Sequence, residues 1–169
     1  MNGEELRRRY ATGERNFSGL NLRGVNISGI SPDLDLAAYD ELCPEFAADL
    51  SGINLSGANL RGAILAGSNL TNANLSNANL MRAALDGCNL TKTNLSNANL
   101  TRAILNQVDL EGTNMRGANL LYAEISGAYF RPTTDMRGAR NVKTVDFTGT
   151  PIHGLVLEDG TIIDSDHDW

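Results

Sequence analysis

The chain has 169 residues, a formal net charge of −6 and 41% hydrophobic residues, and its length fits one domain. No run of residues approaches the ~18 consecutive apolar residues that a membrane-spanning helix needs. Two cysteines are too few for a disulfide scaffold, and the first residues lack the apolar core of a signal peptide. We therefore expect a single cytoplasmic domain.

Residues 1–13 are predicted to form a short capping helix. Asn2 is a suitable N-cap, and Glu5 follows it at the spacing of a capping box. Leu6 and Tyr10 fall on one helical face. A helix this short with one apolar face is expected to cover an open end of the structure that follows it.

Residues 48–132 repeat every five residues without a gap, and residues 15–29 add three similar units. A period of five matches neither a helix nor a strand, so it indicates a stacked architecture. Each five has a large apolar centre, and the predicted core is Leu50, Leu55, Leu60, Leu65, Leu70, Leu75, Leu80, Leu85, Leu90, Leu95, Leu100, Leu105, Leu110, Met115, Leu120, Ile125 and Phe130. Two residues before the centre the side chain is small, with Ala in eleven of seventeen cases, and the residue between is Asn or Asp in twelve. This alternation predicts a short extended side with the first and third residues facing inward.

The last two residues of each five are rich in Gly, Asn and Ser, which suit a tight corner. The fives resemble one another best at a spacing of twenty, as residues 63–65, 83–85 and 103–105 show. Twenty residues with four corners predict a square coil whose equivalent sides stack ~4.8 Å apart. The uninterrupted repeat would then be roughly 20 Å tall.

The unit Ala73-Asn74-Leu75-Ser76-Asn77 resembles those of the pentapeptide-repeat family. The resemblance implies an all-β fold, a right-handed quadrilateral β-helix. It implies little about function, because members of the family that share this architecture do different things or have no assigned role. The best-studied activity in the family belongs to quinolone-resistance proteins, dimeric rods that resemble duplex DNA and bind DNA gyrase.

Between the two sets of repeats, residues 30–47 break the pattern. Ser31-Pro32 resembles an N-cap followed by proline at the first helical position. Leu34, Ala38 and Leu42 share a helical face. We interpret residues 31–43 as a helical excursion that lies against the outside of the β-helix. The alternative is an irregular loop with no defined role.

The fives lose register over residues 133–169. The apolar centres Phe130, Met136 and Phe147 are separated by six and eleven residues. Residues 154–163 are then predicted to form a hairpin that turns at Asp159-Gly160 and closes this end of the solenoid. A short acidic tail follows.

Catalytic motifs are not found. His153 and His167 have no nucleophile and orienting acid in an identifiable motif, and the glycines mark corners, so no phosphate-binding loop is expected. Cys88, at a small inward position, is interpreted as a core residue. The tail Asp164–Asp168 resembles a calcium loop but lacks its Gly and its final Glu. We therefore expect no enzyme, cofactor or metal site, with metal capture by the tail as a distant alternative.

The outward middle residues form ladders along each side. Two sides carry mostly Asn, which predicts stacked amide hydrogen bonds, with ligand recognition as the alternative. A further side carries Ile64, Ala84, Ile104 and Glu124, three of them apolar although they face outward. This stripe is a candidate interaction face, unless residues 31–43 or the C-terminal segment cover it.

The main hypothesis is a non-catalytic scaffold that binds a protein partner, or a second copy of itself, through the Ile64, Ala84, Ile104 and Glu124 face. The alternative is a DNA mimic that modulates gyrase, which the net charge of −6 invites. The charge distribution argues against it, because residues 48–131 hold five acids and six bases. Direct nucleic-acid binding is not expected either, since no Lys/Arg patch with interleaved aromatic residues is visible in the sequence.

Overall fold

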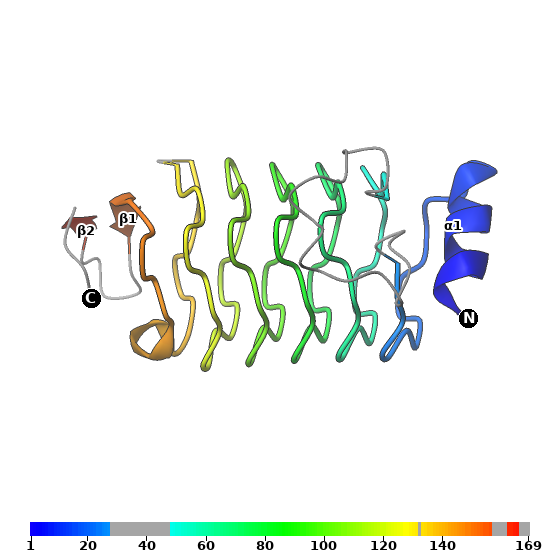
Figure 1. The fold of residues 1–169 in the computed structure, drawn as a ribbon, viewed down its shortest axis with the longest axis horizontal. Coiled ribbons are helices and arrows are strands. Elements are labelled where there is room, and N and C mark those ends of the chain that lie inside the picture. The colour runs from blue at the N-terminus through cyan, green and yellow to red at the C-terminus, as the bar shows by residue number, and fades with distance from the viewer. Residues whose placement is uncertain (28–47, 132, 157–161, 166–169) are drawn as a thin grey trace, which may run out of the picture.

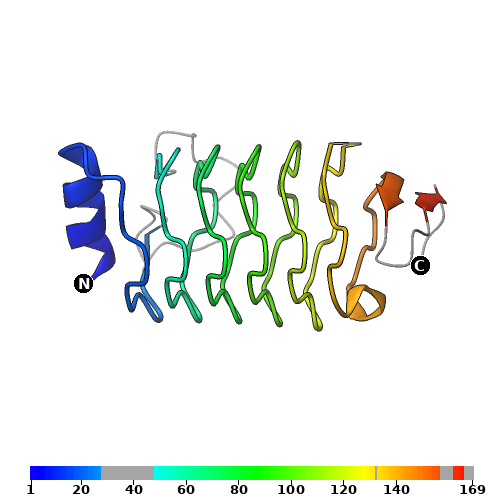
Figure 2. The ribbon, with the colours of Figure 1, turned by 180° about the vertical axis from the view of Figure 1, so that it is seen from behind.

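A computed structural model describes residues 1–27, 48–131, 133–156 and 162–165 (Figure 1). Helix α1 (Gly3–Ala11) lies at one end of a row of stacked coils, and strands β1 (Ile152–Val156) and β2 (Ile162–Ser165) lie at the other. The view from behind shows the same row of coils (Figure 2). The fold is the predicted right-handed quadrilateral β-helix. Within the described ranges no helix is both long and apolar enough to cross a bilayer.

Each coil has four short sides, which stack on their equivalents in the next coil through parallel bridges. We name the sides by their outward middle residues: side A begins at Asp49, side B at Asn16, side C at Asn21 and side D at Asn26. From Asp49 to Tyr129 every bridge joins residues twenty positions apart, as the sequence predicts. Sides B, C and D are six residues deep, or about 24 Å at ~4.8 Å a step.

An insertion separates the first three sides from the rest of the solenoid. Asn16 bridges to Asn54, a step of 38 residues in place of twenty. Eighteen residues are therefore inserted between Ile27 on side D and Leu50 on side A. The helix predicted at 31–43 lies outside the described residues.

Each corner is a tight turn whose third residue has a positive φ. The N–H of Ile53 donates to the carbonyl oxygen of Leu50 at 3.1 Å, and Gly52 between them has a φ of 67°, which is the pattern of a type II turn. Eight corners place a residue other than glycine at a φ of 55–59°: Asn72, Asn77, Arg82, Lys92, Asn97, Arg102, Gln107 and Tyr122. Hydrogen bonds to the next coil hold these residues in a conformation that costs free energy in isolation.

The predicted core residues fill the interior. All seventeen centres are buried, with Phe130 the most exposed at 6%. Several small inward residues carry hydroxyl groups, and Thr113 Oγ1 donates to the carbonyl oxygen of Leu90 at 2.7 Å. Ser68 is fully buried, and its hydroxyl has no hydrogen-bond partner among the described residues.

Helix α1 caps the first coil. The Asn2 side chain accepts the N–H of Glu5 at 2.8 Å, whereas the Glu5 carboxylate pairs with Arg8 and so does not complete the predicted capping box. Leu6 is fully buried in the core, and the Tyr10 hydroxyl donates to the carbonyl oxygen of Ser51 at 2.6 Å. The predicted capping helix is confirmed.

The last coil is irregular. Asn114 bridges to Asp135 and Glu124 to Asp146, steps of 21 and 22 residues, and the short 3-10 helix η3 (Val142–Thr144) forms one corner. Strands β1 and β2 pair antiparallel, with Leu155 opposite Ile163, which confirms the hairpin. The proposed turn at Asp159-Gly160 and the tail after Ser165 lie outside the described residues.

Candidate interaction face

Side D brings together all four residues of the candidate face. Ile64 bridges to Ala84, Ala84 to Ile104 and Ile104 to Glu124, so the four stand one above another on a flat, parallel ladder. Their neighbours along the chain, such as Ala63 and Leu65, are buried, which directs the middle residues outward by the alternation of an extended chain. Ile64 is 41% exposed.

The apolar part of side D is bounded at both ends by polar residues. Asn26 precedes Ile64 in the ladder, and Glu124 and Asp146 follow Ile104. The stripe therefore covers three consecutive coils, or about 10 Å along the axis at ~4.8 Å a step. A contiguous outward apolar patch with a polar rim is the usual composition of a binding surface.

The edge between sides D and A is neutral to acidic. Its corners carry Ala66, Asp86, Asn106 and Ser126. Burial raises the pKa of the half-buried Asp86 carboxyl, and the nearby Glu124 charge acts in the same direction. Asn106 Oδ1 accepts the N–H of Ser126 at 2.9 Å. Side D thus has one carboxyl group, that of Asp86, on this margin and another, that of Glu124, at its upper end.

The opposite edge, between sides C and D, carries a row of arginines, which we call the arginine edge: Arg23, Arg61, Arg82 and Arg102. The corners stack directly, because the N–H of Gly24 donates to the carbonyl oxygen of Arg61 at 2.8 Å and the N–H of Arg82 to that of Thr101 at 3.0 Å. The next corner holds Tyr122, which is 56% exposed, with the Arg102 guanidinium 5.8 Å from its ring centre.

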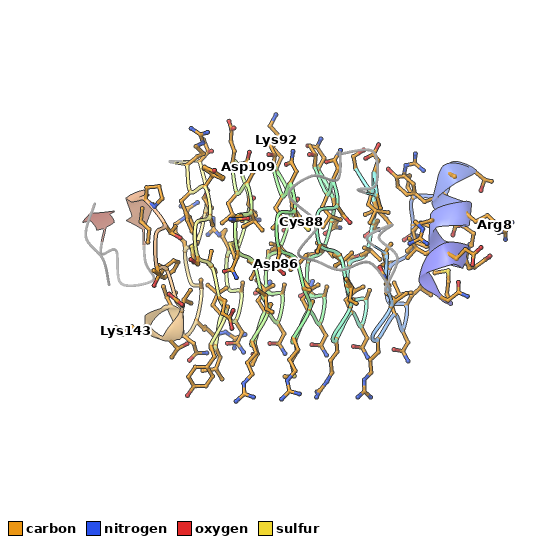
Figure 3. All side chains as sticks on the ribbon, viewed as in Figure 1. Arg8, Asp86, Cys88, Lys92, Asp109 and Lys143 are labelled. Atoms are coloured by element: carbon orange, nitrogen blue, oxygen red, sulfur yellow. The ribbon has the colours of Figure 1, made fainter. Side chains whose placement is uncertain are left out.

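The side chains of this edge can be followed in Figure 3. In Figure 3 nitrogen-tipped side chains project in a row from the long edge on which Lys143 lies, opposite the edge that carries Lys92. None of the four arginines is among the ion pairs found in the described part of the chain. We did not expect this basic row from the sequence. Its signal is a recurrence of Arg at corner positions about twenty residues apart, which the insertion after Ile27 interrupts.

The asparagine ladders use their amides within the fold. Asn94 Nδ2 donates to Asn74 Oδ1 at 3.4 Å, and Asn114 Nδ2 donates to Asn94 Oδ1 at the same distance. Asn94 Oδ1 also accepts the N–H of Ser96 at 3.1 Å. This arrangement favours the structural role over ligand recognition, because the amides already bond within the chain.

Among the described residues, the other candidates show no reactive or metal-binding site. Cys88 is 1% exposed, its Sγ donates to the carbonyl oxygen of Leu65 at 3.1 Å, and burial raises the pKa of the thiol to about 12. The described side chains include no cluster of three or more His, Cys, Asp or Glu that could hold a metal. The side chains of His153, His167 and the Asp164–Asp168 tail are outside the described set.

Comparison with known proteins identifies the repeat. The family model for pentapeptide repeats, eight copies long, matches residues 48–83, 78–117 and 93–131. No curated protein matches the chain.

Similar chains among solved structures include pentapeptide-repeat proteins. HetL, involved in heterocyst differentiation regulation in Nostoc sp. strain PCC 7120, is 23% identical over 96% of this chain and 100% of its own, with a TM-score of 0.35. Another Nostoc PCC 7120 repeat protein is 31% identical over 67% of this chain and 80% of its own, with a TM-score of 0.34. QnrB1, a plasmid-mediated fluoroquinolone resistance protein, is 17% identical over 85% of this chain and 78% of its own, with a TM-score of 0.27. TM-scores this low carry no argument about function.

Proposed function

The chain belongs to the pentapeptide-repeat family, and from this premise we propose that it is a non-catalytic scaffold that binds a protein partner, or a second copy of itself, through side D. The observation that carries the proposal is the outward apolar ladder of Ile64, Ala84 and Ile104. The proposed compartment is the cytoplasm, which suits the free thiol of Cys88 because cytosolic proteins keep their thiols reduced.

Side D lacks the amide ladder of sides B and C at three successive positions. On sides B and C most outward residues are asparagines, several of which bond from coil to coil, as Asn94 does to Asn74, and each such bond contributes about 1 kcal/mol. Side D forgoes these bonds at Ile64, Ala84 and Ile104, and the middle position does not contribute to the core. A partner that covers these side chains explains them, and the alternative is cover by residues 31–43, which lie outside the described residues, or by the C-terminal segment.

The scaffold also suits recognition because it is rigid. Each side of the coil is held by backbone hydrogen bonds above and below, as when the N–H of Ala84 donates to the carbonyl oxygen of Ala63 at 2.9 Å. A partner that docks on a preorganised surface loses less free energy to ordering that surface. A flat ladder about 10 Å long is small for an interface, so we expect the flanking edges to contribute contacts as well.

The first test replaces the two large residues of the stripe. In the Ile64→Asp/Ile104→Asp double variant, a docked partner would bury carboxylates in an apolar contact, at a cost on the order of 2 kcal/mol or more. We expect a partner captured by the wild-type chain from its native cell, identified by mass spectrometry, to be lost or bound at least tenfold more weakly. Sedimentation velocity of the wild-type chain and of the double variant tests self-association: if side D binds a second copy, the variant should lose that association.

Tyr129→Asp is the matched control. Tyr129 is 56% exposed on side A, so this variant also places an aspartate where an exposed apolar side chain stood, but away from side D. Equal capture by the wild-type and double-variant chains would remove side D as the interface.

Gyrase modulation is the weaker candidate. The net charge of −6 favours it, but a DNA mimic needs negative charge spaced along the rod, as phosphates are along the duplex. The repeat from 48 to 131 holds six bases against five acids, and four bases line one edge from Arg23 to Arg102. An effect on gyrase supercoiling at micromolar protein would revive this candidate.

A further inference from the structure

The arginine edge and the apolar stripe lie side by side. Arg82 and Arg102 each stand two residues before the outward residue of side D in their own coils, Ala84 and Ile104. Arg61 stands three residues before Ile64. A partner that covers side D therefore meets a column of cations along one margin of the contact.

Between residues 66 and 127 the other margin carries a single carboxylate and no base. Asp86 lies on the edge between sides D and A, and Glu124 lies at the upper end of side D. A partner with a row of carboxylates is attracted to the arginine edge and finds no such row of cations on the other margin. We propose that the partner of side D is an acidic amphipathic helix that lies along the solenoid axis, with its carboxylates on the arginine edge and its apolar residues on Ile64, Ala84 and Ile104. This inference rests on the proposed function of side D.

The spacing of the coils favours a helix over an extended strand. The four arginines occupy four successive coils, which span about 14 Å in three steps of ~4.8 Å. Residues on one face of an α-helix recur every turn, so three turns span about 16 Å at ~5.4 Å each. Residues on one face of a strand recur every ~6.7 Å, and three such steps span about 20 Å. The helix spacing thus matches the arginine edge more closely than the strand spacing does, with a mismatch over the row of about 2 Å against about 6 Å.

The arginines of this edge are available to form ion pairs with the carboxylates of a partner. Arg82, Arg102 and Arg23 are exposed, and among the described residues none of the four arginines is held in an ion pair. Guanidinium groups bind carboxylates in a bidentate geometry. Tyr122, at the end of the row, adds an exposed aromatic surface of the kind enriched in protein interfaces. A row of arginines beside an apolar surface favours a protein partner that carries both carboxylates and apolar residues over a nucleic acid.

The test uses designed helical peptides on the full-length chain. The probe is an 18-residue alanine-based peptide with glutamates at i, i+4, i+7 and i+11 and leucines at i+1, i+5, i+8 and i+12. Two control peptides carry lysine or glutamine in place of each glutamate. Binding is measured by fluorescence anisotropy at low salt. We expect the glutamate peptide to bind at least tenfold more tightly than either control and to weaken on added salt.

The protein variant is the triple substitution Arg61→Gln/Arg82→Gln/Arg102→Gln. Glutamine occupies a corner naturally at Gln107, with a φ of 57°, so the substitutions suit the backbone. The matched control, Lys92→Gln/Arg116→Gln/Arg131→Gln, removes the same charge from other corners. We expect the first triple variant to bind the glutamate peptide about tenfold more weakly, which is the combined effect of three exposed ion pairs, and the control to bind within twofold of wild type.

The outcomes separate this inference from the proposed function. If Ile64→Asp/Ile104→Asp abolishes capture of the native partner, but the arginine variant retains that partner and the wild-type chain binds all three peptides equally, side D is an interface whose partner is not an acidic helix. Tighter binding of a 20-nucleotide oligothymidylate than of the glutamate peptide, lost in the arginine variant, would assign the edge to nucleic acid and overturn the inference.

Discussion

Replacing Gly3 by alanine tests how closely the capping helix packs on the first coil. Gly3 is buried in the first turn of α1. A Cβ built on Gly3 would overlap the carbonyl oxygen of Asn26, and would lie 2.8 Å from the carbonyl carbon of Asn26 and 3.3 Å from Val25 Cγ2. These atoms belong to backbone and to a buried side chain, so the helix must move to accommodate the methyl group.

The movement has a cost that can be assembled from the contacts of α1. Overpacking of this kind costs about 1–3 kcal/mol. A shifted helix also loses part of the burial of Leu6, worth about 2 kcal/mol when complete, and strains the bond from the Tyr10 hydroxyl to Ser51, worth about 1 kcal/mol. We expect Gly3→Ala to destabilise the docked helix by about 2–4 kcal/mol. Helix propensity alone predicts the opposite sign, because alanine in a helix is favoured over glycine by about 0.5–1 kcal/mol.

Amide hydrogen exchange of α1 is the assay, because a terminal cap can open without unfolding the coils. A cost of about 3 kcal/mol should speed the exchange of the α1 amides roughly a hundredfold and leave the amides of the central coils unchanged. Glu4→Ala, which alters an exposed residue of the same turn, is the control and should change exchange little. Unchanged or slower exchange of α1 in Gly3→Ala would refute the close packing of Gly3 on Asn26.

Two further predictions concern the interior. Ser68→Ala removes a buried hydroxyl that has no partner among the described residues, so we expect the free energy of unfolding, measured in urea, to rise by about 1 kcal/mol. Thr113→Ala breaks the 2.7 Å hydrogen bond to Leu90 and should lower that free energy. A change of the same sign in both variants would contradict this interpretation. The second prediction concerns Cys88 in a Cys43→Ser variant, which leaves Cys88 as the one thiol of the chain. Cys88 should not react with a thiol reagent at pH 8 until the chain unfolds, because burial raises its pKa to about 12 and leaves the thiol protonated. Rapid labelling of the folded protein would show that the reagent reaches the core.

The sequence predicts the fold well because the signals that determine it are local and repeated. Each Leu centre is predicted to face inward because it ends an extended side whose first residue is small and whose middle residue is mostly polar, and the spacing of twenty shows which sides stack. The same two periods place Ile64, Ala84 and Ile104 in one outward ladder, which the structure confirms as geometry. The binding role of that ladder stays a prediction.

The arginine edge is harder to see in the sequence. Arg61 occupies the first corner position of its unit, whereas Arg82 and Arg102 occupy the second, so the spacing is 21 and then twenty. Arg23 precedes Arg61 by 38 residues because the insertion lies between them. A search for runs of Lys and Arg finds nothing, since the residues meet only when the coils stack.

The internal hydroxyl bonds are hidden for a similar reason. The sequence predicts a small inward residue at Thr93 and Thr113, and both are buried. It does not show that their hydroxyls donate to Leu70 and Leu90, 23 residues earlier. That step combines one coil of twenty residues with the three residues around a corner, so it is apparent only in three dimensions.

The corners explain how one repeat can keep its fold and still carry a specific surface. Inward positions are tightly constrained, because any change of volume there is felt by the packed core. A corner position must only take a positive φ, and the hydrogen bonds of the stack impose that φ on Arg82, Lys92, Gln107 and Tyr122 alike. Their side chains point away from the core, so charge can be gathered at one edge at little cost to stability. The arginine edge is therefore more readily explained by recognition than by folding, and its loss should change binding while leaving the solenoid intact.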